Sequence, residues 1–428
     1  MYVIIIKQWT IYKAMLAFLV LALFSCAPKK INQSTFSNLY KKGQHDFNDK
    51  FIIYHLNDSV SKLFFDFSNE RFLYKKADTN AHYYSNIKVF LKIKSVDDLN
   101  LVKDTSSLII YDKQDHNLSK QLSGSLLFKL KKGTSYYIDI DIRDINKKVN
   151  YTSTVFSDKT TRFLRQNFLI SNNNGDIFFS SHYKPNEKVV VHTNINKDTS
   201  YQIDCFNSNF NLASPPFSSE PMPHFSYKPD SSYLLSTNNQ KLEILLSKKG
   251  FYHLKTNHTT KDGVTFFVFD SVFPKLKNTE KMILATRYVM AKKEFDGCMA
   301  SNNKKECIDK FWLDIGGNTD KAKELIKKYY GRVQEANILF TSFKEGWKTD
   351  RGMIYIIFGP PNKVSKTKNE EIWTYGEIDN SNSIIFYFVK VINPFTDNDY
   401  YLQRNETLKE PWYQAVDSWR QGKIYLGK

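Results

Sequence analysis

The amino-acid sequence predicts a multidomain protein with two antiparallel β-sandwich domains of the Ig/Fn3-like kind, followed by an α+β module. Three observations support this fold class. The chain has 428 residues, which is long for one domain. Up to about residue 275, short runs alternate between apolar and polar residues, as strands with one solvated face do. Beyond Pro274 the apolar period changes from 2 to 3.6, which indicates helices.

Residues 1–25 resemble a bacterial lipoprotein signal peptide. Two lysines precede an apolar run at 14–24, which is shorter than the ~20 residues that a membrane-spanning helix needs. The run ends in Leu-Phe-Ser-Cys at Cys26, which resembles a lipobox, whose cysteine thiol receives a diacylglyceryl group. A plain signal peptide followed by a free cysteine is the alternative.

The lipobox resemblance implies a location as well. In lipoproteins of Bacteroidetes, acidic residues after the cysteine direct export to the cell surface, and here residues 27–30 are Ala-Pro-Lys-Lys. We therefore expect a lipid anchor in the outer membrane and a chain that faces the periplasm. Residues 26–50 are polar and are expected to form a tether, so that the two sandwiches would space the C-terminal module from the lipid.

Residues 51–160 are expected to form the first sandwich. At 87–94 and 138–142, isoleucine, valine or leucine occupies every second position, which predicts antiparallel strands. Residues 161–275 are expected to form the second sandwich. Four runs predict its strands: 188–192, 241–246, 251–255 and 264–269. The proline-rich segment 214–229 predicts a long loop or a sheet edge.

Residues 276–428 are expected to form the α+β module. The sequence predicts a helix over 279–296, a second helix that ends at Gly316-Gly317, a long third helix with an apolar stripe, and a last one over 411–421. The first three each follow an asparagine suited to an N-cap: Asn278, Asn303 and Asn318. Three further apolar segments predict a three-stranded antiparallel meander: 353–358, 371–375 and 384–391.

Cys298 and Cys307 flank a polar turn, and the predicted compartment permits disulfides. A bridge between them would stabilise the fold by about 2–3 kcal/mol. The alternative is that both pack as small apolar residues between two helices. Neither cysteine has CxxC spacing, so we expect no redox site, no metal and no cofactor.

A glycine-bracketed motif carries a family resemblance. The residues that carry it, and that we take as candidates for interaction, are Gly346, Trp347, Thr349, Asp350, Arg351, Gly352, Gly359, Pro360, Trp373 and Tyr375. With the preceding long helix they resemble the GWxTD domain of Bacteroidetes and related envelopes, over about residues 275–428. The match departs at 313–317, where an Arg-Asp-Pro-like segment is expected. The family has no defined molecular function, so the resemblance implies architecture and location rather than activity.

The motif allows two interpretations. Asp350 could act as a base and Arg351 as an anion clamp in a hydrolase. Alternatively the motif is a structural turn, in which Thr349 or Asp350 caps backbone donors, Gly352 supplies a positive φ, and Asp350 pairs with Arg351 or another base. All nine histidines precede residue 259, which excludes a histidine-dependent triad or histidine-ligated metal formed within the module.

Five of the six tryptophans lie in the module: Trp312, Trp347, Trp373, Trp412 and Trp419. They could form a core, a glycan platform or an interface. Periodicity places Trp312, Trp373 and Trp419 inward, whereas Trp347 lies among turn residues and is expected to be exposed.

The net charge of +17 favours anionic partners, but no nucleic-acid recognition motif accompanies it. We expect a non-enzymatic scaffold or accessory subunit of an envelope complex for secretion, assembly or uptake. The alternatives are a cell-surface glycan-binding module and a hydrolase that uses Asp350 and Arg351.

Overall fold

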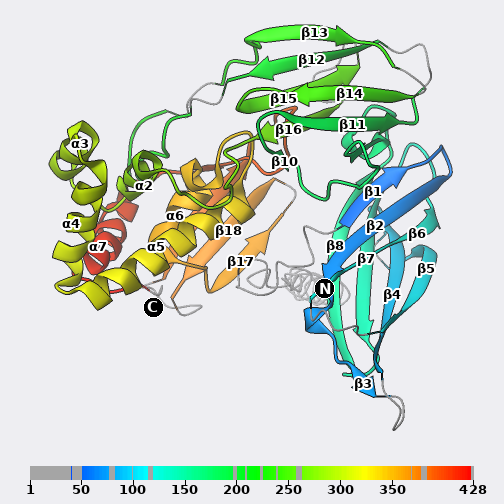
Figure 1. Ribbon diagram of the computed structural model, residues 1–428, viewed down its shortest axis with the longest axis horizontal. Coiled ribbons are helices and arrows are strands. Elements are labelled where there is room, and N and C mark those ends of the chain that lie inside the picture. Colours follow the sequence, from blue (N-terminus) through cyan, green and yellow to red (C-terminus); the bar gives the residue numbers. More distant parts are fainter. Residues whose placement is uncertain are drawn as a thin grey trace, which may run out of the picture.

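The structure is a computed structural model. It describes residue 40 and residues 51–76, 82–98, 100–113, 119–195, 200–207, 210–221, 225–237, 240–256, 263–367, 369–376 and 383–425. The predicted signal peptide, Cys26 and all of the predicted tether except residue 40 lie outside these ranges. Mostly antiparallel sheets form two β units, and a C-terminal module of helices and a strand meander follows (Figure 1). Within the described ranges, no helix is both long and apolar enough to cross a membrane.

The first β unit consists of two sheets around one core. One sheet has the order β1-β2-β6; the other has the order β3-β4-β7-β8, with β5 also paired to β4. The strands are β1 (Phe51–His55), β2 (Val60–Ser68), β3 (Lys75–Lys76), β4 (Tyr83–Ser95), β5 (Val102–Lys113), β6 (Gln121–Lys129), β7 (Ser135–Asp144) and β8 (Val149–Asp158). As predicted, Val89 and Leu91 of β4 and Ile140 of β7 point inward, where they share a core with Phe65 of β2.

The second β unit also has two sheets, in the orders β14-β11-β9 and β10-β16-β15-β12-β13. The strands are β9 (Phe168–Ser171), β10 (His182–Tyr183), β11 (Glu187–Thr193), β12 (Tyr201–Phe206), β13 (Ser231–Leu235), β14 (Lys241–Leu246), β15 (Gly250–Thr256) and β16 (Val264–Val268). Only the β10–β16 pair is parallel among the strand pairs that the structure describes. The proline-rich segment connects β12 to β13, as expected for a loop.

Strands β15 and β16 are buried on both faces. One face packs in the core of the second β unit, and the C-terminal module covers the other. Six phenylalanines form this contact, four from the second β unit and two from the module: Phe206, Phe251, Phe267, Phe269, Phe343 and Phe395. The rings of Phe251 and Phe395 lie 4.8 Å apart at an edge-to-face angle. The second β unit and the module therefore share an apolar interface.

The C-terminal module places its helices against a four-stranded sheet (Figure 1). The helices are α2 (Thr279–Thr286), α3 (Lys292–Ala300), α4 (Lys304–Gly316), α5 (Thr319–Phe340), α6 (Asp350–Phe358) and α7 (Lys409–Arg420). The predicted caps are confirmed: the side chains of Asn278, Asn303 and Asn318 accept hydrogen bonds from backbone N–H groups in the first turns of α2, α4 and α5.

The single helix predicted over 279–296 is wrong, because the chain turns between α2 and α3. The backbone N–H of Ala291 donates to the Glu294 carboxylate at 2.7 Å, which starts a new helix there. A disulfide between Cys298 and Cys307 then joins α3 to α4, with 5.5 Å between the two Cα atoms.

The strand predicted at 353–358 is also wrong, since these residues belong to helix α6. All nine residues of α6 are buried, so the apolar run has no polar face to reveal a helical period. The sheet consists instead of β17 (Lys363–Lys366), β18 (Glu370–Tyr375), β19 (Ile384–Lys390) and β20 (Tyr400–Leu402), in that order. The second and third predicted strands correspond to β18 and β19.

Candidate functional site

The glycine-bracketed motif forms a short 3-10 turn, Gly346–Lys348, that leads into helix α6. Thr349 is the N-cap: its hydroxyl donates to the Gly346 carbonyl at 2.7 Å and accepts from the Gly352 N–H at 3.0 Å. The Trp347 N–H donates to the Asn337 side chain of α5 at 3.2 Å. Thr349 therefore caps backbone donors, as the structural interpretation predicted, and the Trp347–Asn337 hydrogen bond ties the motif to α5.

Both glycines of the motif are required by close backbone contacts. A Cβ atom on Gly346 would lie 2.0 Å from the Ala336 carbonyl oxygen, and one on Gly352 would lie 1.9 Å from the Gly346 carbonyl oxygen. The predicted positive φ at Gly352 is wrong, because this residue is helical. The positive φ belongs to Gly359 at the end of α6, where φ is +84°.

The expectation that Trp347 is exposed is wrong. Its side chain is fully buried, and Tyr288 donates a hydrogen bond to its carbonyl at 3.0 Å. Trp312, Trp373 and Trp419 are buried as predicted, and Trp412 is 5% exposed. The module's tryptophans thus form its core rather than a surface platform.

Asp350 and Arg351 point to different partners. Asp350 pairs with Arg404 at 2.6 Å and accepts from the Leu402 N–H at 2.8 Å, which ties α6 to β20. Arg351 donates to Glu371 at 3.2 Å and to the Asn398 carbonyl at 2.9 Å. Asp350 and Arg351 are 7% and 2% exposed, so the polar groups of both serve contacts inside the module.

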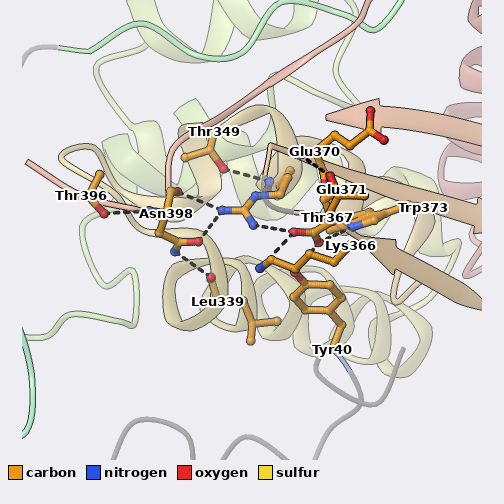
Figure 2. Close-up of polar contacts among 12 residues, drawn as sticks. Tyr40, Leu339, Thr349, Lys366, Thr367, Glu370, Glu371, Trp373, Thr396 and Asn398 are labelled. Carbon is orange, nitrogen blue, oxygen red and sulfur yellow. Dashed lines mark hydrogen bonds and ion pairs between the residues drawn. The ribbon is translucent and has the colours of Figure 1, made fainter. Parts of the chain in front are cut away.

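Glu371 of β18 is the centre of a buried polar cluster (Figure 2). Its carboxylate accepts from Arg351, from the Trp373 indole at 2.7 Å and from the Tyr40 hydroxyl, and Lys366 lies 3.6 Å away. Burial by itself would raise the pKa of Glu371, but the positive charges of Arg351 and Lys366 outweigh it and hold the pKa below its ordinary value. The group is therefore a carboxylate at neutral pH.

Tyr40 reaches this cluster from the segment that we predicted to be a tether. Its ring lies 5.3 Å from Phe340 and 5.2 Å from Trp373, and it is 5% exposed. Burial, and then the charge of Glu371, raise the pKa of Tyr40 well above its ordinary value, so the hydroxyl stays protonated. The tether prediction is wrong at this position, which is part of the module's core. The aromatic residues of the segment are the sequence signal that part of it packs against the fold.

The remaining predicted site residues lie at the end of α6. The Tyr375 hydroxyl donates to the Gly359 carbonyl at 2.8 Å, and Pro360 follows at the surface. Arg332 of α5 donates hydrogen bonds to the carbonyls of Ile356 and Ile357 at 3.0 and 2.9 Å. These two carbonyls lie in the last turn of α6, where they have no partner within the helix. In the described part of the chain, no group of three or more histidine, cysteine, aspartate or glutamate side chains gathers to hold a metal.

A cavity of about 630 Å³ lies where the second β unit meets the module. Its charged lining combines six lysines with three acidic residues: Lys249, Lys275, Lys277, Lys281, Lys344, Lys348, Asp270, Glu280 and Glu345. Lys281 bridges Asp270 and Glu345, at 2.7 Å from each. The excess of lysine leaves the cavity positively charged.

The comparison with known families agrees with the motif. Residues 250–421 match the GWxTD domain. The matched range begins at β15 and so includes two strands of the second β unit as well as the helices and the four-stranded sheet. Tyr40 lies outside it.

No curated protein matches the chain. Similar solved structures include the C-terminal domain of the Streptococcus agalactiae AgI/II polypeptide BspA, in its wild-type and a mutant form. For the wild type the identity is 11%, with 51% of this chain and 97% of that chain covered. The TM-score of 0.17 is too low to define a shared fold.

Proposed function

We propose that this protein is a lipid-anchored outer-membrane lipoprotein of the Bacteroidetes type that acts as a non-enzymatic scaffold or accessory subunit of an envelope complex for secretion, assembly or uptake. Its chain would face the periplasm, and its two β units would be Ig/Fn3-like sandwiches. The N-terminal pattern that ends at Cys26 supports the anchor.

One observation carries the non-enzymatic part of the proposal. The GWxTD residues are buried, and their polar groups bind one another, the backbone or neighbouring buried side chains. Such residues build the module's shape and leave its outer surface for a partner. The hydrolase hypothesis gains no support from Asp350 and Arg351, since Asp350 forms an ion pair with Arg404 and Arg351 with Glu371 inside the module.

Tyr40 changes the expected geometry of the anchored protein. Tyr40 lies only 14 positions after Cys26. A fully extended chain spans at most ~3.6 Å per residue, so the module would lie within about 50 Å of the anchor. The module would then stand near the membrane, and the two β units would not act as spacers. The lysine-lined cavity is a suitable contact for an anionic partner group there.

Two measurements on cells test the anchor and the location. Metabolic labelling with an alkyne fatty acid should modify the wild-type protein and not a Cys26→Ser variant; equal labelling of both would refute the anchor. Protease added to intact cells should leave a periplasm-facing protein intact. Digestion would instead favour the cell surface and the glycan-binding alternative.

Co-purification tests the scaffold role. The native protein, tagged at its C-terminus and extracted in mild detergent, should retain an envelope protein in stoichiometric amount. A clean monomer without a partner would refute the scaffold proposal.

A further inference from the structure

We propose that the pocket around Glu371 is a recognition site for an unmodified tyrosine in a peptide segment. It holds the chain's own Tyr40 and can accept the same tyrosine from a separate segment. The proposal goes beyond the scaffold role and does not depend on lipidation of Cys26. A negative result in the fatty-acid labelling experiment would therefore not contradict it.

The pocket and its occupant come from different parts of the chain. The rings that flank Tyr40, Phe340 and Trp373, and the acceptor Glu371, all belong to the GWxTD range, whereas Tyr40 precedes that range by more than 200 positions. The pocket and its occupant are therefore separate segments of the chain, as a binding site and its ligand are.

Its polar groups select the tyrosine hydroxyl. Glu371 is fully buried and is oriented by Arg351 and the Trp373 indole. A phenylalanine in the slot would remove a charge-assisted hydrogen bond from this carboxylate. A phosphotyrosine would bring about two negative charges against it, which the neighbouring Arg351 and Lys366 cannot offset without breaking their pairs with Glu371.

A backbone contact extends recognition from a phenol to a peptide. The Tyr355 hydroxyl lies 3.3 Å from the Tyr40 carbonyl oxygen and 2.9 Å from the Glu335 carboxylate. The pocket therefore contacts the main chain of its ligand as well as the side chain. In the intact chain, residues 41–50 connect Tyr40 to β1, and a link this short gives an effective concentration of about 1 mM. A separate peptide will bind measurably only when Tyr40 is removed.

The test uses the full chain in detergent and a fluorescent peptide of residues 34–46, followed by anisotropy. A Tyr40→Ala variant should bind the peptide, and the wild type should bind it at least about 10-fold more weakly because its pocket is filled. The same peptide with phenylalanine should bind the variant roughly 10- to 100-fold more weakly. The phosphotyrosine peptide should not bind. Tyr111→Ala, at a side chain that is 73% exposed, is the matched control and should behave as the wild type.

Two further variants keep the result decisive. Glu371→Gln in the Tyr40→Ala background should narrow the preference for the tyrosine peptide over the phenylalanine peptide, because a neutral amide oxygen accepts a weaker hydrogen bond than a carboxylate does. If Tyr40→Ala does not fold, Tyr40→Phe fills the slot but removes the hydrogen bond from the Tyr40 hydroxyl to Glu371. The tyrosine peptide should still bind this variant more tightly than it binds the wild type. A folded variant that binds neither peptide, or binds both equally, would overturn the proposal.

Discussion

Replacing Gly352 with alanine should destabilise the C-terminal module, although alanine is normally the better helix former. Gly352 lies in the first turn of α6, and a Cβ atom there would meet the Gly346 carbonyl oxygen at 1.9 Å and its carbonyl carbon at 2.8 Å. Both are backbone atoms and cannot rotate away. The 3-10 turn and α6 must therefore separate, and with them the contacts that Asp350 and Arg351 make.

Gly331 in α5 provides the matched control. A Cβ atom at this position has no neighbour within 4 Å apart from its own helix, so Gly331→Ala should stabilise the module by about 0.5–1 kcal/mol. Overpacking against a fixed backbone costs about 3 kcal/mol, near the upper end of the usual range. For a domain of this size, 1 kcal/mol shifts the melting temperature by about 2–4 °C. The Gly352→Ala variant should then melt roughly 6–12 °C lower and the Gly331→Ala variant slightly higher.

Tryptophan fluorescence reports the melting of the module, because all tryptophans after residue 9 lie in it. The two substitutions are chemically identical and both lie in helices, so only the surroundings separate their effects. A Gly352→Ala protein that melts within a degree of the wild type, or that is stabilised as Gly331→Ala is, would refute the close contact between the motif's two glycines.

Three further predictions concern stability and are checked by unfolding measurements. Arg351→Met should leave the Glu371 carboxylate buried without its arginine partner and lower the module's free energy of unfolding by about 3–5 kcal/mol. A melting temperature within 2 °C of the wild type would contradict the buried ion pair. Burial lowers the pKa of His55 to about 4, below the unfolded value of 6.5, so the stability that its neutral form contributes is complete above pH 6.5 and falls as the pH drops toward 4. Calorimetry should show the first β unit losing about 2 kcal/mol between pH 7 and 5, and an unchanged transition would refute the buried neutral imidazole. Reducing the Cys298–Cys307 disulfide should cost the module about 2–3 kcal/mol, and a Cys298→Ser variant should show the same loss and no further response to reductant.

The sequence was sufficient for features that depend on neighbouring residues. The asparagine caps were predictable, because an N-cap bonds to a backbone N–H only three positions later. The strands at Ile87–Ile93 and Ile138–Ile142 were predictable, because one face of each is buried and the other is solvated, which imposes the period of two.

Helix α6 was mispredicted for the opposite reason. It is buried on every side, so its apolar run carries no period, and its β-branched isoleucines favour a strand by propensity. Thr349 was recognised as a cap, but of a turn before a strand; it caps the backbone N–H of Gly352 in the first turn of α6.

Only the tertiary structure determined the partners of the motif. Asp350 pairs with Arg404, which is 54 positions away, and Arg351 with Glu371, whereas the sequence offered Arg351 as a nearer partner for Asp350. Tyr40 is the extreme case, since 331 positions separate it from Glu371. Local propensity and period act over a few residues, so the sequence was sufficient for the antiparallel strands, for most of the C-terminal helices and for the family motif. The buried charges find their partners only when the chain is folded, and that pairing turned a predicted tether residue into part of the module's core.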